Sequence, residues 1–149
     1  GVYPLASVAA RQGRIAMAHI LGDAVKPLRT DRVAGNIFTT PEIATVGVSE
    51  KDIEEGLYRG DTVMLSLTTN PRAKMMAVSD GFVKVFARKH SGTVIGGVVV
   101  GPRASELIFP ISLAVEKKLT VDDLAETFTV YPSLSGSVSE AAPKLPTRG

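Results

Sequence analysis

The sequence contains no cysteine, and this absence removes several kinds of chemistry from the chain. Structural disulfides, metal sites built on thiolates and catalysis by a thiol all require cysteine side chains. Long apolar runs are missing as well, since none approaches the roughly 20 residues of a membrane-spanning helix. The first residues do not show the charged, apolar and cleavage regions of a signal peptide. We therefore expect a cytoplasmic protein with no membrane partner.

Aromatic side chains are scarce, at 5% of the residues, and the net charge is only +2. Surfaces that bind nucleic acids combine a basic stripe with aromatic side chains that stack on bases. Lysine and arginine are instead interspersed with acidic residues here, so we expect no nucleic-acid partner. The acidic run at Asp52, Glu54 and Glu55 has no histidine or further carboxylate at a ligand spacing, which predicts a solvated helix face rather than a metal site.

The 149 residues are 44% hydrophobic and 21% charged, which is typical of one compact domain with a core. Alternating apolar residues predict strands, and apolar residues at helical spacing predict helices. The predicted strands are 36–47 (interrupted at 40–42), 62–68, 82–88 and 93–100, and the predicted helices are 4–22, 50–56, 104–118 (kinked at Pro110) and 121–125, with a turn at 70–74. This order indicates an α+β domain, an antiparallel sheet with flanking helices.

Local residue chemistry adds detail to this outline. Pro4 is a suitable first helical residue and Gly22 a suitable stop. Ser49 with Asp52 resembles a capping box, and Thr120 is a suitable N-cap. The adjacent Gly96 and Gly97 inside a strand predict a close backbone approach or a bulge. No G-x-G-x-x-G sequence is present, so the glycines do not form a dinucleotide-binding fingerprint.

The stretch from Thr129 to Ala142 combines an extended approach, a Tyr-Pro corner and a short helix. Tyr131 is kept out of the helical region by the proline that follows it. Pro132 suits the entrance of a helix, and the hydroxyl of Ser133 can cap the N–H groups beyond it. From local chemistry alone, this stretch predicts a capped C-terminal helix with a buried tyrosine.

Four blocks of the sequence resemble, in order, the C-terminal part of the pyridine nucleotide-disulfide oxidoreductases, the family of lipoamide dehydrogenase and glutathione reductase. The blocks are residues 1–14, 38–47, 101–108 together with 119–125, and 129–142. The resemblance implies the dimerisation domain of an FAD-dependent member, which uses NADH or NADPH as donor and forms a homodimer. It also implies a division into a flavin-side helix and connector (1–30), the dimerisation domain (31–142) and a tail (143–149).

The first block resembles the flavin-binding helix of the family, whose N-terminal N–H groups face the flavin ring. Pro4, Leu5, Ala6 and Ser7 match those positions, although Pro4 has no N–H to donate. The Gly-Asp pair of the family motif falls just before Gly1. We therefore expect the chain to begin inside a larger protein, with the FAD- and NAD(P)-binding domains upstream. On its own the chain is expected to bind no cofactor and to be inactive.

The last block resembles the C-terminal signature of the family, in which a histidine and a glutamate form an acid–base pair. Tyr131 stands at the histidine position and Gly136 at the glutamate position, so no catalytic residue is expected in this chain. By the resemblance, Tyr131 and Pro132 cap the flavin site of the partner subunit. A phenol with a pKa of about 10 is a poor base at neutral pH.

These replacements favour a quinone as the electron acceptor of the full-length protein, because a quinone takes a hydride or electrons directly from reduced flavin. Two alternatives stay open from the sequence. In the first alternative, the chain is a fragment of a dihydrolipoamide dehydrogenase that tolerates the altered pair. In the second, it is a cofactor-free module that dimerises.

Overall fold

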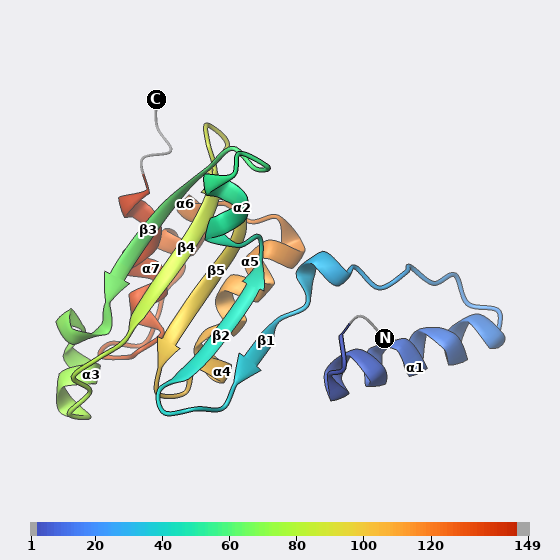
Figure 1. Cartoon of the computed structure of the whole chain (residues 1–149), viewed down its shortest axis with the longest axis horizontal. Helices are drawn as coiled ribbons and strands as arrows, with labels where there is room; N and C mark the ends of the chain where they lie inside the picture. Colours follow the sequence, from blue (N-terminus) through green and yellow to red (C-terminus); the bar gives the residue numbers. More distant parts are fainter. Residues whose placement is uncertain (1–2, 146–149) are drawn as a thin grey trace.

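The computed structural model describes residues 3–145, and its centre is a 5-stranded sheet with the strand order β1-β2-β5-β4-β3 (Figure 1). Every neighbouring pair of strands is antiparallel. The strands are β1 (Gly35–Ile37), β2 (Glu42–Gly47), β3 (Gly60–Ser66), β4 (Phe82–Arg88) and β5 (Val94–Gly101). The predicted α+β class and antiparallel sheet are confirmed.

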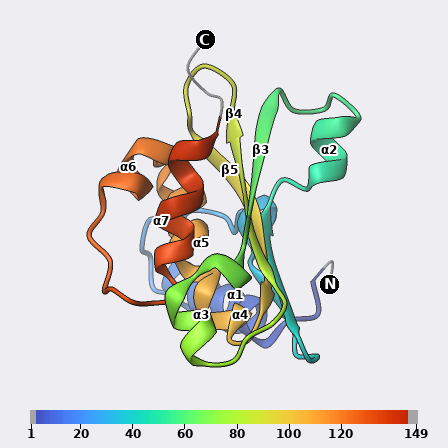
Figure 2. The ribbon, with the colours of Figure 1, turned by 90° about the vertical axis from the view of Figure 1, so that its left-hand side faces the viewer.

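The helices cover one face of the sheet more fully than the other. In the edge-on view, α5, α6 and α7 lie on one side and α2 lies on the opposite side (Figure 2). The helices are α1 (Ala6–Ile20), α2 (Glu50–Glu54), α3 (Pro71–Met75), α4 (Ala104–Leu107), α5 (Phe109–Lys117), α6 (Val121–Glu126) and α7 (Gly136–Ala141), with short 3-10 helices η1 (Thr30–Arg32), η2 (Leu67–Thr69) and η3 (Ala142–Lys144). No described helix is long and apolar enough to cross a membrane.

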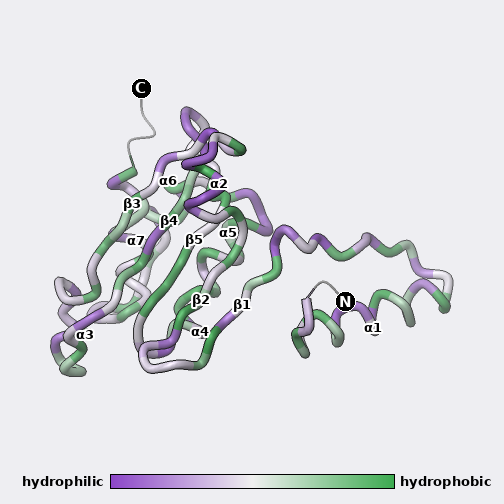
Figure 3. Tube along the Cα trace, in the orientation of Figure 1, coloured by the Kyte–Doolittle hydropathy of each residue, from purple (hydrophilic) through white to green (hydrophobic). Residues whose placement is uncertain are grey.

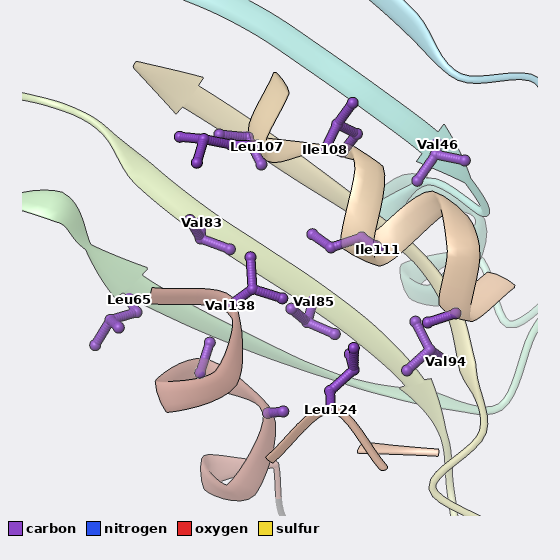
Figure 4. Close-up of a cluster of buried hydrophobic side chains, with 14 of the residues drawn as sticks. Val46, Leu65, Val83, Val85, Val94, Leu107, Ile108, Ile111, Leu124 and Val138 are labelled. Carbon is purple, nitrogen blue, oxygen red and sulfur yellow. The ribbon is translucent and has the colours of Figure 1, made fainter. Parts of the chain in front are cut away.

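The hydrophobic core lies between the sheet and helices α5 to α7. Apolar residues follow the strands in the hydropathy view (Figure 3), and their side chains meet those of the helices (Figure 4). Val83 and Val85 of β4, Ile111 of α5 and Val138 of α7 are all nearly or fully inaccessible to solvent. The alternation that predicts the strand at 82–88 is confirmed, because Val83, Val85 and Ala87 are all buried in this cluster.

The glycine pair in β5 fits a close backbone approach. A Cβ atom added at Gly96 would lie 2.8 Å from the Val48 nitrogen, and one added at Gly97 would lie 2.7 Å from the Lys84 oxygen. The β4–β5 register also shifts between Phe86 and Ala87, beside these glycines. The predicted close approach is therefore confirmed, and the pairing of β4 with β5 is irregular beside it.

Both short helices predicted from capping residues begin as expected. The Ser49 hydroxyl donates a hydrogen bond to Asp52 Oδ2 (2.6 Å), and the Ser49 backbone N–H donates to the same oxygen (2.9 Å). Thr120 and Asp123 form the same capping box at α6. These bonds stabilise the carboxylates: the Ser49 hydroxyl, and then its N–H, lower the pKa of Asp52, and the Thr120 N–H, and then its hydroxyl, lower the pKa of Asp123.

Two prolines, Pro4 and Pro110, differ from the prediction in their position relative to the helices. Pro4 precedes α1, because Leu5 is the extended N-cap residue and the helix begins at Ala6. Pro110 does not kink one long helix. Helix α4 ends at Leu107 and α5 begins at Phe109, so Pro110 lies in the first turn of a new helix, where a missing N–H costs no hydrogen bond.

Two further segments differ from the prediction. The segment 36–47 is two antiparallel strands, and Glu42 belongs to the second of them rather than to the interruption. The predicted turn at 70–74 is helix α3, which begins after Asn70. The tail expected at 143–149 begins within η3, and Leu145 packs into the core, while residues 146–149 lie outside the described part.

Helix α1 stands beyond the β1 edge of the sheet and is joined to it by an extended connector (Figure 1). Its C-terminus ends as predicted, because Gly22 has a φ of +89° and the Asp23 N–H donates to the Ala18 carbonyl (3.0 Å). Within α1, which the structure describes completely, only Val8 is buried. Most of this helix surface therefore has no covering from the rest of the described chain.

Candidate functional site

The segment between α6 and α7, residues 127–135, is the candidate site, and we call it the Tyr-Pro loop. Its first half exposes apolar side chains. Phe128 is 102% exposed, and Val130 and Tyr131 are each 78% exposed. The prediction of a buried tyrosine, made from local chemistry alone, is wrong, because the loop carries Tyr131 away from the core. Exposed apolar side chains in sequence indicate a surface that contacts another molecule.

The second half of the Tyr-Pro loop is held firmly. Leu134 is 8% exposed and packs into the core. The Gly136 N–H donates to Ser133 Oγ (3.1 Å), so the predicted capping role of Ser133 is confirmed. Pro132 does not form the helix entrance, because α7 begins only at Gly136, with Ser135 as its N-cap residue. One half of the loop is therefore exposed and the other half is fixed to the domain.

Asn70 joins the Tyr-Pro loop to α3, although 63 residues separate it from Ser133. Its Nδ2 donates to the Ser133 carbonyl (2.9 Å) and to Ser137 Oγ (2.8 Å). Its Oδ1 accepts from the N–H groups of Arg72 (2.8 Å) and Ala73 (3.2 Å). Asn70 was not among the predicted site residues. The available signal was its position before Pro71, since Asn followed by Pro is a favoured N-cap and first helical residue.

A cavity of about 320 Å³ opens beside the loop, lined among others by Thr129, Tyr131, Gly136 and Glu140. Gly136 contributes no side chain to it. A Cβ atom added there would lie 3.5 Å from Ser133 Oγ and 3.7 Å from Thr129 Oγ1, which are ordinary contacts. The exposed Glu140, one helical turn further along α7, provides a carboxylate at this cavity. The cavity therefore has room for a larger side chain at position 136.

A second cavity, of about 410 Å³, is lined by Pro132 and Ser135 of the loop. Arg72, Arg103 and Glu106 are among its lining residues, so it carries charges of both signs. Among residues 3–145, no group of three or more His, Cys, Asp or Glu side chains has the arrangement of a metal site.

The other predicted cofactor residues lie at the start of α1. Leu5 is its N-cap residue without a side-chain cap, and Ala6 and Ser7 are the first exposed helical residues. Their N–H groups have no acceptor within the helix, which favours a negatively charged or electron-rich partner. Within this chain α1 lies beyond the β1 edge of the sheet, whereas α7 packs against β3 and β4 toward the opposite edge (Figure 1). The structure therefore does not bring Pro4, Leu5, Ala6 and Ser7 together with Tyr131 and Pro132.

Comparison with known proteins gives a consistent set of similarities. The family described as pyridine nucleotide-disulphide oxidoreductase, dimerisation domain, matches residues 33–142. A Mycobacterium tuberculosis protein named NAD(P)H dehydrogenase (quinone) is 58% identical over 145 residues, which cover 97% of this chain and 29% of that protein. A dihydrolipoyl dehydrogenase of Haloferax volcanii is 39% identical over 138 residues, covering 93% of this chain and 29% of that protein.

The fold has a close structural counterpart. The crystal structure of LpdA from Mycobacterium tuberculosis superimposes with a TM-score of 0.94 at 58% identity, over 97% of this chain and 31% of that chain. The chain thus spans 29% of the length of the curated relatives it matches. The similarity covers α1, the sheet and the Tyr-Pro loop together.

Proposed function

The chain belongs to the pyridine nucleotide-disulphide oxidoreductase family as its dimerisation domain, and from this premise we propose that its Tyr-Pro loop completes the flavin site of a partner subunit. In this proposal the full-length protein is an FAD-dependent NAD(P)H oxidoreductase that forms a homodimer. The FAD- and NAD(P)-binding domains precede this chain. NADH or NADPH is the donor, and the electron acceptor is a quinone.

The observation that carries the proposal is the combination of exposure and anchoring in one loop. Phe128, Val130 and Tyr131 are largely exposed, while Ser133 is bonded to Asn70 and to the N–H of Gly136. A loop that exposes apolar side chains from a fixed base suits a contact with a second subunit, because little further ordering is required on binding. This arrangement supports Tyr131 and Pro132 as residues that face the partner's cofactor.

The choice of a quinone follows from the side chains at positions 131 and 136. Neither the phenol of Tyr131 nor the hydrogen of Gly136 supplies a general base at neutral pH. Bound FAD carries the redox chemistry in this proposal, so the chain's own residues position the acceptor and limit the access of water. The name of the relative at 58% identity, NAD(P)H dehydrogenase (quinone), supports the same acceptor.

The start of α1 is the second part of the proposal. We assign residues 1–30 to the FAD-binding side of the full-length protein, 31–142 to the dimerisation domain and 143–149 to a tail. Exposed N–H groups at Ala6 and Ser7 support a contact of Leu5, Ala6 and Ser7 with the flavin, and Pro4 contributes its ring but no N–H.

Ile15 and His19 of α1 line an apolar groove of about 600 Å³ with the connector, which supports contact with a further part of the protein. A cytoplasmic location belongs to the same proposal.

Acceptor turnover by the full-length protein tests the proposed chemistry. We expect NADH or NADPH to reduce a simple quinone efficiently, and lipoamide to be turned over poorly. Efficient lipoamide turnover would instead favour the second candidate, a dihydrolipoamide dehydrogenase, which the relative at 39% identity supports. The double variant Tyr131→His, Gly136→Glu is the matched comparison, because it restores the acid–base pair of the family in the same loop.

Dimerisation is tested separately by sedimentation. The full-length protein is expected to sediment as a dimer, and a strict monomer at high concentration would contradict the proposed role of the loop. The isolated chain mixed with FAD is expected to remain colourless after gel filtration, because the phosphate-binding part of the flavin site lies upstream in this proposal. Yellow protein would show that the chain binds the cofactor alone.

A further inference from the structure

Asn70 is unusual among the polar residues of this chain because its side chain is 1% exposed and fully hydrogen-bonded. An amide has two N–H donors and one oxygen that accepts two hydrogen bonds. Asn70 uses all of them: Nδ2 donates to Ser133 and Ser137, and Oδ1 accepts from Arg72 and Ala73. The side chain has one orientation, because rotating the amide by half a turn would point donors at donors.

The two halves of this network have different partners. The Oδ1 side caps α3, whereas the Nδ2 side binds the Tyr-Pro loop and α7. Ser133 is the residue immediately after Pro132, whose φ is fixed by its ring. A bond that holds the Ser133 carbonyl therefore also restricts the position of Pro132 and the backbone of Tyr131. Capping alone would require only the Oδ1 half of the side chain.

We propose that Asn70 is a positioning residue for the electron acceptor step: it fixes the Tyr-Pro loop so that Tyr131 and Pro132 take up one position at the partner's flavin site. The inference rests on the proposed function, since the loop must face that site. Asn70 acts through the backbone of the loop and does not touch the acceptor. Ser137, at 0% exposure, is the second member of the anchor.

The substitution Asn70→Asp separates capping from positioning. A carboxylate still accepts from Arg72 and Ala73, and aspartate is as good an N-cap as asparagine. Its second oxygen, however, replaces the donor that faces the Ser133 carbonyl and Ser137 Oγ. Ser137→Ala is the milder variant, because it removes one of the two bonds and leaves the bond to Ser133. The core variant Val94→Ala, at a 2% exposed residue outside this network, measures what a loss of stability alone does.

The experiment is anaerobic stopped-flow kinetics on the full-length FAD-containing protein, with flavin reduction by NADH or NADPH and flavin reoxidation by a quinone followed separately. In Asn70→Asp we expect kcat/KM for the quinone to fall by about ten- to a hundredfold, the range that a misplaced group costs. Reduction of the flavin by the donor is expected to be unchanged. Ser137→Ala should show a smaller loss in the same step, and Val94→Ala should lower Tm without a selective effect on reoxidation.

Tyr131→Ala, measured in parallel, distinguishes a failure of the positioning role of Asn70 from a failure of the proposed function of the Tyr-Pro loop. If Tyr131→Ala slows reoxidation while Asn70→Asp and Ser137→Ala do not, the positioning role is overturned and the proposed function stands. If Tyr131→Ala has no effect either, the loop does not serve the flavin site and both fall. If Asn70→Asp and Ser137→Ala behave like Val94→Ala, with a lower Tm and unchanged kinetics per folded protein, Asn70 is structural only.

Discussion

Replacing Gly136 with alanine is expected to stabilise the chain. Gly136 is the first residue of α7 and is not among the residues with positive φ. An added Cβ would lie 3.5 Å from Ser133 Oγ and 3.7 Å from Thr129 Oγ1, so it meets only ordinary contacts. At such positions Gly→Ala stabilises by about 0.4–1 kcal/mol, chiefly by restricting the unfolded chain. For a chain of this size, we expect Tm to rise by about 1–4 °C in thermal unfolding followed by circular dichroism.

The matched control is Gly96→Ala, where the added Cβ would lie 2.8 Å from the Val48 nitrogen and 2.9 Å from the Val46 oxygen. Both atoms belong to the backbone of neighbouring segments and do not move easily. We expect this variant to lose about 1–3 kcal/mol, as overpacked sites do. A fall in Tm for Gly136→Ala would refute the reasoning. It would mean that a glycine is needed at position 136 for the fold, so that the missing glutamate would reflect a steric need rather than changed chemistry.

Three further predictions concern the stability of the domain. Ile111→Ala, at 0% exposure in the centre of the core, is expected to cost about 2–5 kcal/mol in urea unfolding. Thr120→Ala removes the hydroxyl that caps α6 and should cost about 0.5–2 kcal/mol in the same assay. Asp52 and Asp123 have lowered pKa values, so their stabilising effect is present above the ordinary aspartate pKa and is lost as the pH falls through the lowered values. The double variant Asp52→Asn, Asp123→Asn should therefore lose less stability on acidification than the unmodified chain.

Features set by neighbouring residues were predicted well from the sequence. The capping boxes need only a hydroxyl and a carboxylate three residues apart, and the alternation of Val83, Val85 and Ala87 needs only the period of a strand. Helix α3 was missed because its 5 residues are too few to show a helical period. Its start, Asn70 followed by Pro71, carries residues that favour a turn as well as a helix N-terminus.

The role of Pro110 and the anchoring of the Tyr-Pro loop depend on contacts between distant segments. A proline in an apolar helical pattern is compatible with a kink or with a new helix, and packing of α4 and α5 against β5 selects the second. The bond from Asn70 to Ser133 spans 63 residues, and no local pattern specifies it. Local chemistry alone predicted a buried Tyr131, yet the loop turns this side chain outward to 78% exposure.

The hydrogen bonds that fix the Tyr-Pro loop do not depend on the residue types at positions 131 and 136. The bonds that fix the loop come from the Ser133 carbonyl and hydroxyl, the Ser137 hydroxyl and the backbone N–H of Gly136. The side chain of Tyr131 is largely exposed, and a Cβ added at Gly136 would meet only ordinary van der Waals contacts. Either position can therefore change without breaking an anchoring bond. A change of residue type at positions 131 and 136 would thus alter the surface of the loop while leaving its hydrogen bonds to Asn70 in place.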